Sequence, residues 1–476
     1  MKERLIFLFL FLCSALFAQN KPGILQIYHI NVINVTDGSA RMNQSVILEN
    51  GKIKTIEPFK SIDRKILPSH RIDAKNKFMI PGLWDMHIHL EGAELVEDNK
   101  LLLPVFLAYG ITSVRDCASD LGEQVLQWRQ EIKDNKLTGP TIFTAGLKLE
   151  GKNSIWKGDL EIDNETELEA ILDKLDAFKV DFVKITENTL NGDLFLESVR
   201  QAHRRGYKVS GHVPYDVTIK ELQEAGLTSV EHATYLLRLG ADETSIKEEL
   251  VSGKINRAEA EARYTREFDQ QKAIANYKTM GKTGLFVCPT LIGGRQLAYL
   301  DETDHSKDVF LQYLTKKFVS NYQWRIDRMA NETTTQRQQR KERYNFLLKQ
   351  IPLIQQSGIR IIAGSDAAAL NTYVYPAESF IQELEIMSDA GLTPLQILQA
   401  STMNGAIFFG IENTTGSIDT GKNADLVVLN DNPLENISAI RNINSVIVRG
   451  KYYSRTDLDK MLDEARKRKV ELDNQR

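Results

Sequence analysis

The stretch Met79-Ile-Pro-Gly-Leu-Trp-Asp-Met-His87-Ile-His89 decides the fold, because it is an apolar run that ends in two closely spaced histidines. Such a run predicts a β-strand. Side chains alternate along a strand with a period of two, so His87 and His89 are expected to point to the same face. Two neutral imidazoles on one face make half of a metal site. The stretch therefore predicts a strand that delivers metal ligands at its carboxyl end.

Four further residues with metal-binding potential each close a short apolar or β-branched run later in the chain: Lys184, His212, His232 and Asp366. A lone histidine after a strand is more often a hydrogen-bonded structural residue than a ligand. Here, however, all the candidates occupy the same place in a repeating unit. The repetition favours one shared site.

Between residues 79 and 414, strand patterns alternate with helical stretches, which is typical of parallel βαβ units. We expect strands near residues 80–89, 110–116, 139–146, 180–186, 207–212, 228–232, 284–290 and 359–366. Eight such units predict a (β/α)8 TIM barrel in the α/β class, where functional groups gather at the carboxyl ends of the strands. The six candidates fall at the ends of the first, fourth, fifth, sixth and eighth strands.

The two ends of the chain differ from this central part. Residues 24–78 and 415–455 show short alternating strands, and Asn50-Gly51 is a strong hairpin signal, so both ends are expected to build one small β-sandwich. Thr393 and Gly410 mark the expected bounds of the final barrel helix. Long helical insertions are expected near residues 236–282 and 292–356. They leave the barrel at its active face, so we expect them to shape or cover a pocket.

Residues 1–18 combine a charged start with a short apolar run that ends at Ala18, which predicts a cleaved signal peptide. We therefore expect a periplasmic or secreted protein without stable membrane insertion after cleavage. The formal net charge of -4 and the lack of a basic cluster argue against nucleic acid and favour a small-molecule or short peptide substrate. Cys117 and Cys288 are expected to be buried and unpaired. The sequence leaves a homo-oligomer open.

Histidine and carboxylate ligands without thiolate favour zinc, with manganese, cobalt or nickel admissible. Lys184 is the informative residue, since an ammonium would repel a metal cation. A neutral lysine amine can take up carbon dioxide and form a carbamate, whose two oxygens can serve two divalent metals. Judged alone, Lys184 is more often an ordinary lysine at a strand end, so the residue types leave open both that interpretation and a site with two metal ions and a carboxylated Lys184.

The chain from about residue 24 to residue 453 resembles the amidohydrolase superfamily, most closely its imidazolonepropionase-like and prolidase-like hydrolases with a binuclear centre. The matching text is Pro81-Gly-Leu-Trp-Asp-Met-His-Ile-His89, Val183-Lys-Ile185, Gly211-His212, Val230-Glu-His-Ala-Thr-Tyr235, Ala363-Gly-Ser-Asp366 and Gly421-Lys-Asn-Ala-Asp-Leu-Val-Val-Leu429. The resemblance implies that His87, His89 and Asp366 hold one metal, that His212 and His232 hold the other, and that carboxylated Lys184 bridges them.

The resemblance also implies hydrolysis of a C–N bond, amide or peptide-like, by a bimetal-bound hydroxide, with Asp366 as the proton shuttle. Tyr235 could donate to the developing oxyanion or simply pack. The loop of residues 145–154 lacks the histidine of related dipeptidases, which leaves dipeptide specificity open. A superfamily deaminase or cyclic-amide hydrolase is the nearest alternative, although Lys184 and Tyr215 count against a deaminase. A secreted binding protein without catalysis is the alternative of another class.

Overall fold

The computed structural model describes residues 23–476, so the predicted signal peptide at 1–18 lies outside the described residues. The strands are β1 Leu25–Ile33, β2 Ala40–Glu49, β3 Lys52–Pro58, β4 Arg71–Asp73, β5 Phe78–Pro81, β6 Leu83–Ile88, β7 Ile111–Asp116, β8 Thr141–Thr144, β9 Leu149–Gly151, β10 Leu160–Ile162, β11 Val183–Ile185, β12 Val209–Gly211, β13 Leu227–Glu231, β14 Phe286–Cys288, β15 Arg360–Ile361, β16 Leu426–Leu429, β17 Ile443–Val448 and β18 Lys451–Ser454.

The α-helices are α1 Val96–Ala108, α2 Gly122–Lys133, α3 Glu165–Phe178, α4 Gly192–Arg204, α5 Ile219–Ala225, α6 Glu243–Val251, α7 Arg257–Arg266, α8 Gln270–Gly281, α9 Leu291–Ala298, α10 Lys316–Ser320, α11 Gln323–Met329, α12 Thr334–Gln356, α13 Glu378–Asp389, α14 Pro394–Ala400, α15 Met403–Phe409 and α16 Arg455–Gln475. None of the helices in the described part of the chain is both long enough and apolar enough to cross a membrane.

The central part is a mixed α/β fold with two parallel sheets, β6-β7-β8 and β10-β9-β11-β12-β13-β14-β15. Each of the eight strands predicted between residues 80 and 366 has a counterpart in these sheets. Backbone hydrogen bonds also join the two sheets. Asp181 N donates to Thr144 O at 2.9 Å, and Met86 N donates to Ala363 O at 2.8 Å.

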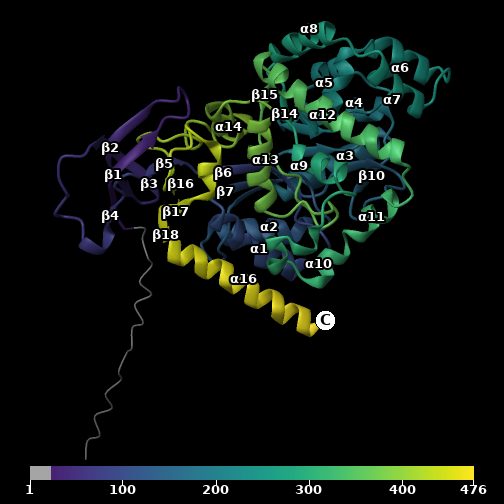
Figure 1. Cartoon of the computed structure of the whole chain (residues 1–476). Helices are drawn as coiled ribbons and strands as arrows, with labels where there is room; N and C mark the ends of the chain where they lie inside the picture. Colours follow the sequence, from purple (N-terminus) through teal and green to yellow (C-terminus); the bar gives the residue numbers. More distant parts are fainter. Residues whose placement is uncertain (1–22) are drawn as a thin grey trace, which may run out of the picture.

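Strands from the two ends of the chain pair in a third sheet, of order β18-β17-β16-β5-β1-β2-β3, with β4 beside β1. Figure 1 shows the purple N-terminal strands beside the yellow C-terminal strands, at one side of the helical body. The hairpin predicted at Asn50-Gly51 is confirmed, because Glu49 pairs with Lys52 in antiparallel β2 and β3. Buried side chains from both chain ends, among them Ile27, Val46 and Leu426, form a core on this sheet.

The predicted strand at 80–89 is wrong in one respect, because it is two strands in different sheets. β5 pairs with β16 of the third sheet, whereas β6 pairs with β7 of the parallel sheet. The chain changes sheets at Gly82, whose N–H donates to Asp425 O at 2.8 Å. A Cβ at Gly82 would lie 2.0 Å from Thr112 Oγ1, so only glycine allows the close approach.

The expected final barrel helix is also divided into α14 and α15. Thr393 caps α14 through a capping box with Gln396, and Gly410 ends α15 in the left-handed conformation, as expected for each position. The chain leaves the helical path at Ser401 and Thr402. There, Ser401 O accepts a hydrogen bond from Trp84 N at 2.8 Å, which ties this break to β6.

The sequence analysis missed α16, because its expected elements ended at residue 455. This helix packs along α1, as Figure 1 shows. The C-terminal Arg476 pairs with Asp98 of α1 at 2.6 Å. Leu458, Ala465 and Leu472 form its buried stripe, although most of the helix surface is polar and exposed. The wide spacing of so few apolar residues gives a weak sequence signal.

We expect Leu458→Ala to lower the free energy of unfolding by about 2–5 kcal/mol, because it removes a fully buried side chain and leaves a cavity. Val470→Ala is the matched control on the same helix, since Val470 is 53% exposed, and it should change stability by less than about 0.5 kcal/mol. Urea unfolding followed by circular dichroism measures both. A loss of unfolding free energy in Leu458→Ala as small as that in Val470→Ala would show that α16 adds nothing to the packed core.

Candidate metal centre

The structure brings the predicted ligands together at the carboxyl ends of the parallel strands. His87 Nε2 and His89 Nε2 lie 3.3 and 3.2 Å from the same oxygen, Oδ1 of Asp366. The potential ligand atoms of these three residues lie within 4.8 Å of one another, which is close enough for one metal ion. On the other side, the Nε2 atoms of His212 and His232 face each other at 3.2 Å. The rings of His87 and His232 connect the two groups, with centroids 5.3 Å apart.

In three of the four candidate ligand histidines the Nδ1 atom is hydrogen-bonded to an outer partner, and in His87 it lies near a carboxylate. His89 Nδ1 lies 2.7 Å from Ala118 O, His212 Nδ1 lies 2.6 Å from Glu187 Oε2, and His232 Nδ1 lies 2.7 Å from Thr290 Oγ1. His87 Nδ1 lies 2.8 Å from Glu231 Oε2. Outer contacts of this kind fix ring orientation and tautomer in metal sites. Here they leave all four Nε2 atoms available to the centre.

Lys184 lies in the middle strand position of β11, next to Ser210 of β12. Its side chain is 1% exposed, and within residues 23–476 its Nζ atom has no hydrogen-bond partner. Burial, together with the nearby charge of Lys184, lowers the pKa of His87 to about 4, so this imidazole is neutral at neutral pH. A buried ammonium without a partner is costly, which makes an unmodified cation at this position unfavourable.

Asp366 is held as a carboxylate by its neighbours. Burial raises its pKa, but His87 and His89 outweigh burial and hold the pKa of Asp366 far below its ordinary value. Its backbone has a positive φ of 60°, and that of His232 has a φ of 70°. Positive φ is strained for residues other than glycine and is found at sites where the surroundings impose it. Hydrogen bonds from Asp366 N to His87 O at 2.7 Å and from His232 N to Cys288 O at 2.8 Å hold these two turns.

Beneath the histidines, Arg115 of β7 and Glu231 of β13 form a fully buried ion pair at 2.7 Å. Arg115 also donates to Met86 O and contacts Ser210 Oγ and Ser229 Oγ. Burial alone would raise the pKa of Glu231, but Arg115 and His87 hold it well below its usual range. A charged carboxylate is therefore fixed against the Nδ1 atom of His87.

Sequence reasoning missed the outer partners Glu187, Glu231 and Thr290. Glu231 had a visible signal, because a carboxylate in an apolar strand directly before His232 must find a buried partner. Glu187 had a weaker one, since it follows Lys184 by three residues. Thr290 ends the seventh predicted strand, where no ligand type drew attention. Cys117 and Cys288 are buried and free, as expected.

Tyr235 lies beside the centre, but its hydroxyl donates to Glu187 Oε1 at 2.8 Å. The same carboxylate holds His212 through its other oxygen. Burial would raise the pKa of Glu187, yet contact with His212 keeps it at about 2. In this structure Tyr235 therefore acts on His212 through Glu187, and its role as an oxyanion donor stays a prediction.

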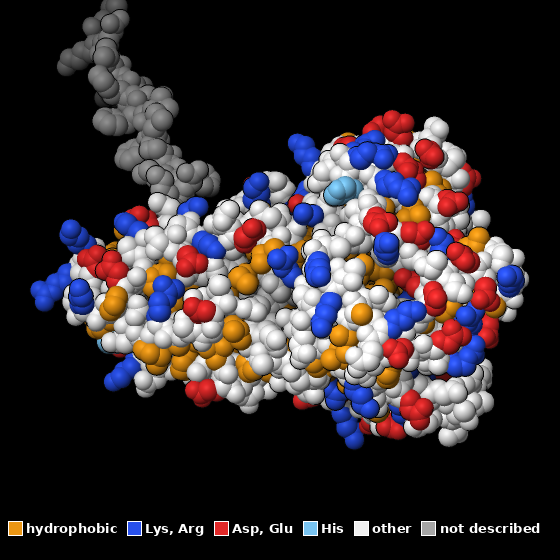
Figure 2. Space-filling model, turned by 90° about the horizontal axis from the view of Figure 1, so that it is seen from above, with side chains coloured by type: hydrophobic (Ala, Val, Ile, Leu, Met, Phe, Trp, Pro, Cys, Tyr) orange, Lys and Arg blue, Asp and Glu red, His pale blue; other side chains and the backbone are white. Residues whose placement is uncertain are grey.

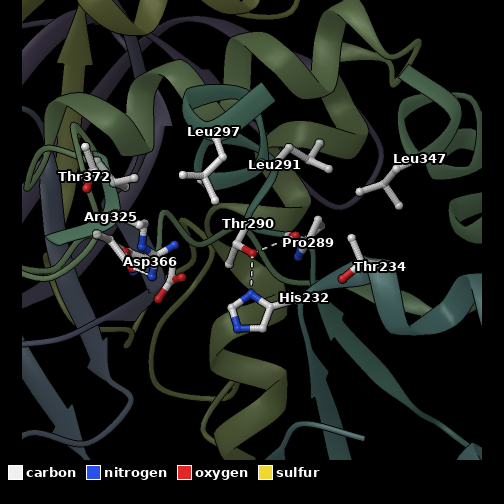
Figure 3. Close-up of a pocket in the computed structure, with 14 residues that line it drawn as sticks. His232, Thr234, Pro289, Thr290, Leu291, Leu297, Arg325, Leu347, Asp366 and Thr372 are labelled. Carbon is white, nitrogen blue, oxygen red and sulfur yellow. Dashed lines mark hydrogen bonds between the residues drawn. The ribbon is translucent and has the colours of Figure 1, made fainter. Parts of the chain in front are cut away.

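Two cavities flank the centre. A cavity of about 260 Å³ reaches Asp366 and His232, as Figure 3 shows, and a second one of about 440 Å³ reaches Glu187 and Tyr215. The insertion near 292–356 lines the first through Leu297, Arg325 and Leu347, while the insertion near 236–282 lines the second through Leu250, Val251 and Arg257. Side chains from both insertions therefore line cavities beside the candidate ligands.

A sequence profile of the amidohydrolase family matches residues 78–452, which is most of the chain. The chain belongs to the amidohydrolase family. The match covers all seven candidate site residues, from His87 to Asp366. As a member of this family, the protein is a hydrolytic enzyme that acts on carbon–nitrogen bonds.

Among curated relatives, this amidohydrolase is 22% identical to ochratoxinase of Aspergillus niger over 86% of this chain and 82% of that protein. It is 29% identical to a 5-methylthioadenosine/S-adenosylhomocysteine deaminase of Syntrophomonas wolfei subsp. wolfei, but that match spans only 24% of this chain and 30% of the deaminase.

Two solved structures show the same fold at low sequence identity. The structure of a Xaa-Pro dipeptidase with bound methionine has a TM-score of 0.66 at 21% identity and covers 91% of this chain and 100% of its own. Bottromycin amidohydrolase has a TM-score of 0.71 at 19% identity, with coverage of 94% and 90%.

We expect Glu187→Ala to weaken zinc binding about 10- to 100-fold, because His212 loses the carboxylate that orients it. Tyr235→Phe is the matched control, since it removes one hydrogen bond to Glu187 and leaves the contact between Glu187 and His212 in place. Tyr235→Phe should therefore weaken zinc binding much less than Glu187→Ala does. Competition with a zinc chelator measures both affinities. Wild-type affinity in Glu187→Ala would contradict the assigned role.

Proposed function

We propose that the chain is an exported, metal-dependent amidohydrolase that cleaves an amide or peptide-like bond of a small molecule or short peptide. The observation that carries the proposal is the state of Lys184. A lysine amine that is buried, has no hydrogen-bond partner among the described residues and lies near His87 and His232 is not explained by packing. Conversion to a carbamate, which would be a ligand for divalent metals, accounts for such a lysine.

In this proposal His87, His89 and Asp366 would hold one divalent metal, and His212 and His232 would hold the other. The distances between their Nε2 and Oδ1 atoms support this division, because each group converges on its own point. Carboxylated Lys184 would supply an oxygen ligand to each metal. Four imidazoles, the carboxylate of Asp366 and a carbamate form a borderline to hard ligand set that suits zinc and also admits manganese, cobalt or nickel.

When bound, the two metals supply an activated water and polarise the scissile carbonyl. The chain's own residues do the rest. Asp366 is ionised at neutral pH and accepts the proton of the attacking water at its carboxylate. It then passes this proton to the departing nitrogen, which leaves as a neutral amine. Glu231 and Glu187 keep the imidazoles of His87 and His212 oriented while the proton moves.

We propose that the two parallel sheets close into a (β/α)8 barrel, and that the third sheet folds as a small β-sandwich of residues 24–78 and 415–455. The closure is supported by the hydrogen bonds from Asp181 to Thr144 and from Met86 to Ala363, and by a parallel bridge between Ile88 and Ala367. The barrel, at 79–414, would place all candidate ligands at its carboxyl face.

The charged start and apolar run of residues 1–18 support export. The surface supports a small substrate rather than nucleic acid, because Figure 2 shows acidic and basic side chains interspersed over the visible face.

A deaminase is less well supported, since Tyr215 stands where those enzymes place a glutamate. A binding protein without catalysis would have no need to keep Lys184 unpartnered among the histidines.

We expect Lys184→Ala to lose metal and activity together, and short carboxylic acids such as acetate to restore part of both by replacing the carbamate. Lys208→Ala is the control, because Lys208 is exposed just before β12. Metal content by mass spectrometry and hydrolysis rates measure the outcome. Normal metal content and turnover in Lys184→Ala would refute the carbamate.

We expect Asp366→Asn to keep much of its metal, because an amide oxygen can still bind, and to lose about 100-fold or more in turnover, because it cannot accept the proton. The test begins with the zinc-loaded mature protein and a screen of dipeptides, N-acyl amino acids and cyclic amides. The best substrate then serves to compare the variant. Turnover near wild type would remove Asp366 as the proton shuttle. Ammonia release from aminated rings without amide cleavage would mean a deaminase.

A further inference from the structure

The cavity beside Asp366 has an apolar wall and a single cationic side chain. Its apolar lining is formed by Pro289, Leu291, Leu297, Leu347 and Val374. In Figure 3, Arg325 lies beside Asp366 at one end of this cavity, and the leucines lie across from them. The volume of about 260 Å³ is below the roughly 300–1,000 Å³ of sites for drug-sized ligands. It suits one amino acid unit.

Arg325 is held in place but has fewer acceptors than donors. Its Nη2 donates to Asn371 Oδ1 at 2.7 Å, and its guanidinium lies 5.1 Å from the ring centroid of Trp324. The indole N–H of Trp324 in turn donates to Leu370 O at 2.9 Å, which fixes the ring against which Arg325 lies. The Nε atom of Arg325 is buried and has no partner among the described residues. Burial lowers the pKa of Arg325, so a second acceptor would stabilise its charge.

A purely structural role for Arg325 would require an ion pair inside the protein. Two carboxylates are near enough to affect its pKa, those of Asp366 and Glu91. Glu91 accepts a hydrogen bond from Leu370 N at 2.8 Å, and Asp366 is directed at His87 and His89. Within residues 23–476 neither of them forms an ion pair with Arg325. A guanidinium with free donors, facing a cavity, is arranged for a planar anion such as a carboxylate.

We infer that Arg325 binds the free carboxylate of the leaving amino acid, so that the substrates are N-acyl amino acids with apolar side chains. This inference rests on the proposed function, because Asp366 lines the same cavity and would protonate the leaving nitrogen. The leaving group must therefore occupy this side of the centre. Its side chain would contact Leu291, Leu297 and Leu347, while the acyl group would extend toward the second cavity.

The test compares N-acetyl-leucine and N-acetyl-phenylalanine with their C-terminal amides as substrates of the zinc-loaded enzyme. The wild type should prefer the acids by about 10- to 100-fold in kcat/KM, the range for hydrogen bonds to charged groups. Arg325→Met should remove this preference mainly through a higher KM for the acids, with the amides unaffected. Arg325→Lys keeps the charge but not the planar donor pair, so it should keep part of the preference.

Arg328→Met is the matched control. Arg328 lies on the same helix, α11, with its guanidinium 5.2 Å from the ring centroid of Trp324, but it is exposed and does not line the cavity. It should behave as the wild type. Equal hydrolysis of acids and amides by the wild type would overturn the inference, even if a variant failed to fold. So would an acid preference that survives in folded Arg325→Met.

Calorimetry separates failure of this inference from failure of the proposed function. If no amide bond is cleaved in any acid or amide, the proposed function is wrong in its substrate range. Binding of N-acetyl-leucine to the metal-loaded protein, at least about 10-fold tighter than binding of its amide and lost in Arg325→Met, would still support the carboxylate site. Equal binding of the acid and the amide would reject it.

Discussion

A fully buried guanidinium under the candidate centre determines how the parallel strands must be arranged. Arg115 cannot lose its charge, so every donor that it brings into the interior needs an acceptor. Met86 O, Glu231 and the serines of β12 and β13 provide these acceptors, and the rings of Phe182 and Phe408 lie 5.3 and 4.9 Å from its centre. Strands from distant parts of the chain are therefore fixed around one side chain.

The buried ion pair of Arg115 and Glu231 also contacts a candidate metal ligand, His87. Glu231 balances Arg115 on one side and contacts His87 on the other, so the interior ion pair and the imidazole share one carboxylate. Removing one member of a buried pair leaves the other uncompensated, which is costly. Stability and ligand orientation thus depend on the same carboxylate. Glu187 couples His212 and Tyr235 in a comparable way on the opposite side of the centre.

The long insertions give this family member its own cavity walls. The parallel strands position the candidate ligands, but the apolar wall at Leu297 and Leu347 and the cation at Arg325 come from the segment between β14 and β15. Buried Glu383 of α13 accepts hydrogen bonds from Leu291 N and Ile292 N and so anchors the first turn of α9. The same turn follows Thr290, which holds His232. The wall and the ligand are consequently positioned together.

The sequence by itself determined the positions of eight of the parallel strands and singled out the six candidate ligands, but it missed β9 and β10. Both follow from local signals, namely apolar runs with β-branched residues, each of which ends in a residue with metal-binding potential. The hairpin at Asn50-Gly51 and the caps at Thr393 and Gly410 were predictable for the same reason. Each depends on the backbone preferences of a few neighbouring residues.

Only the tertiary structure decided how those ligands are held. Glu187 is 25 residues from His212, Thr290 is 58 residues from His232, and Arg115 is 116 residues from Glu231. No local pattern connects such pairs, because they meet only when strands from different units lie side by side. The sequence also did not predict the change of sheet at Gly82 or the orientation of Arg325 into the cavity. The first depends on the close approach of Thr112 to Gly82, and the second on the contact between Arg325 and the ring of Trp324.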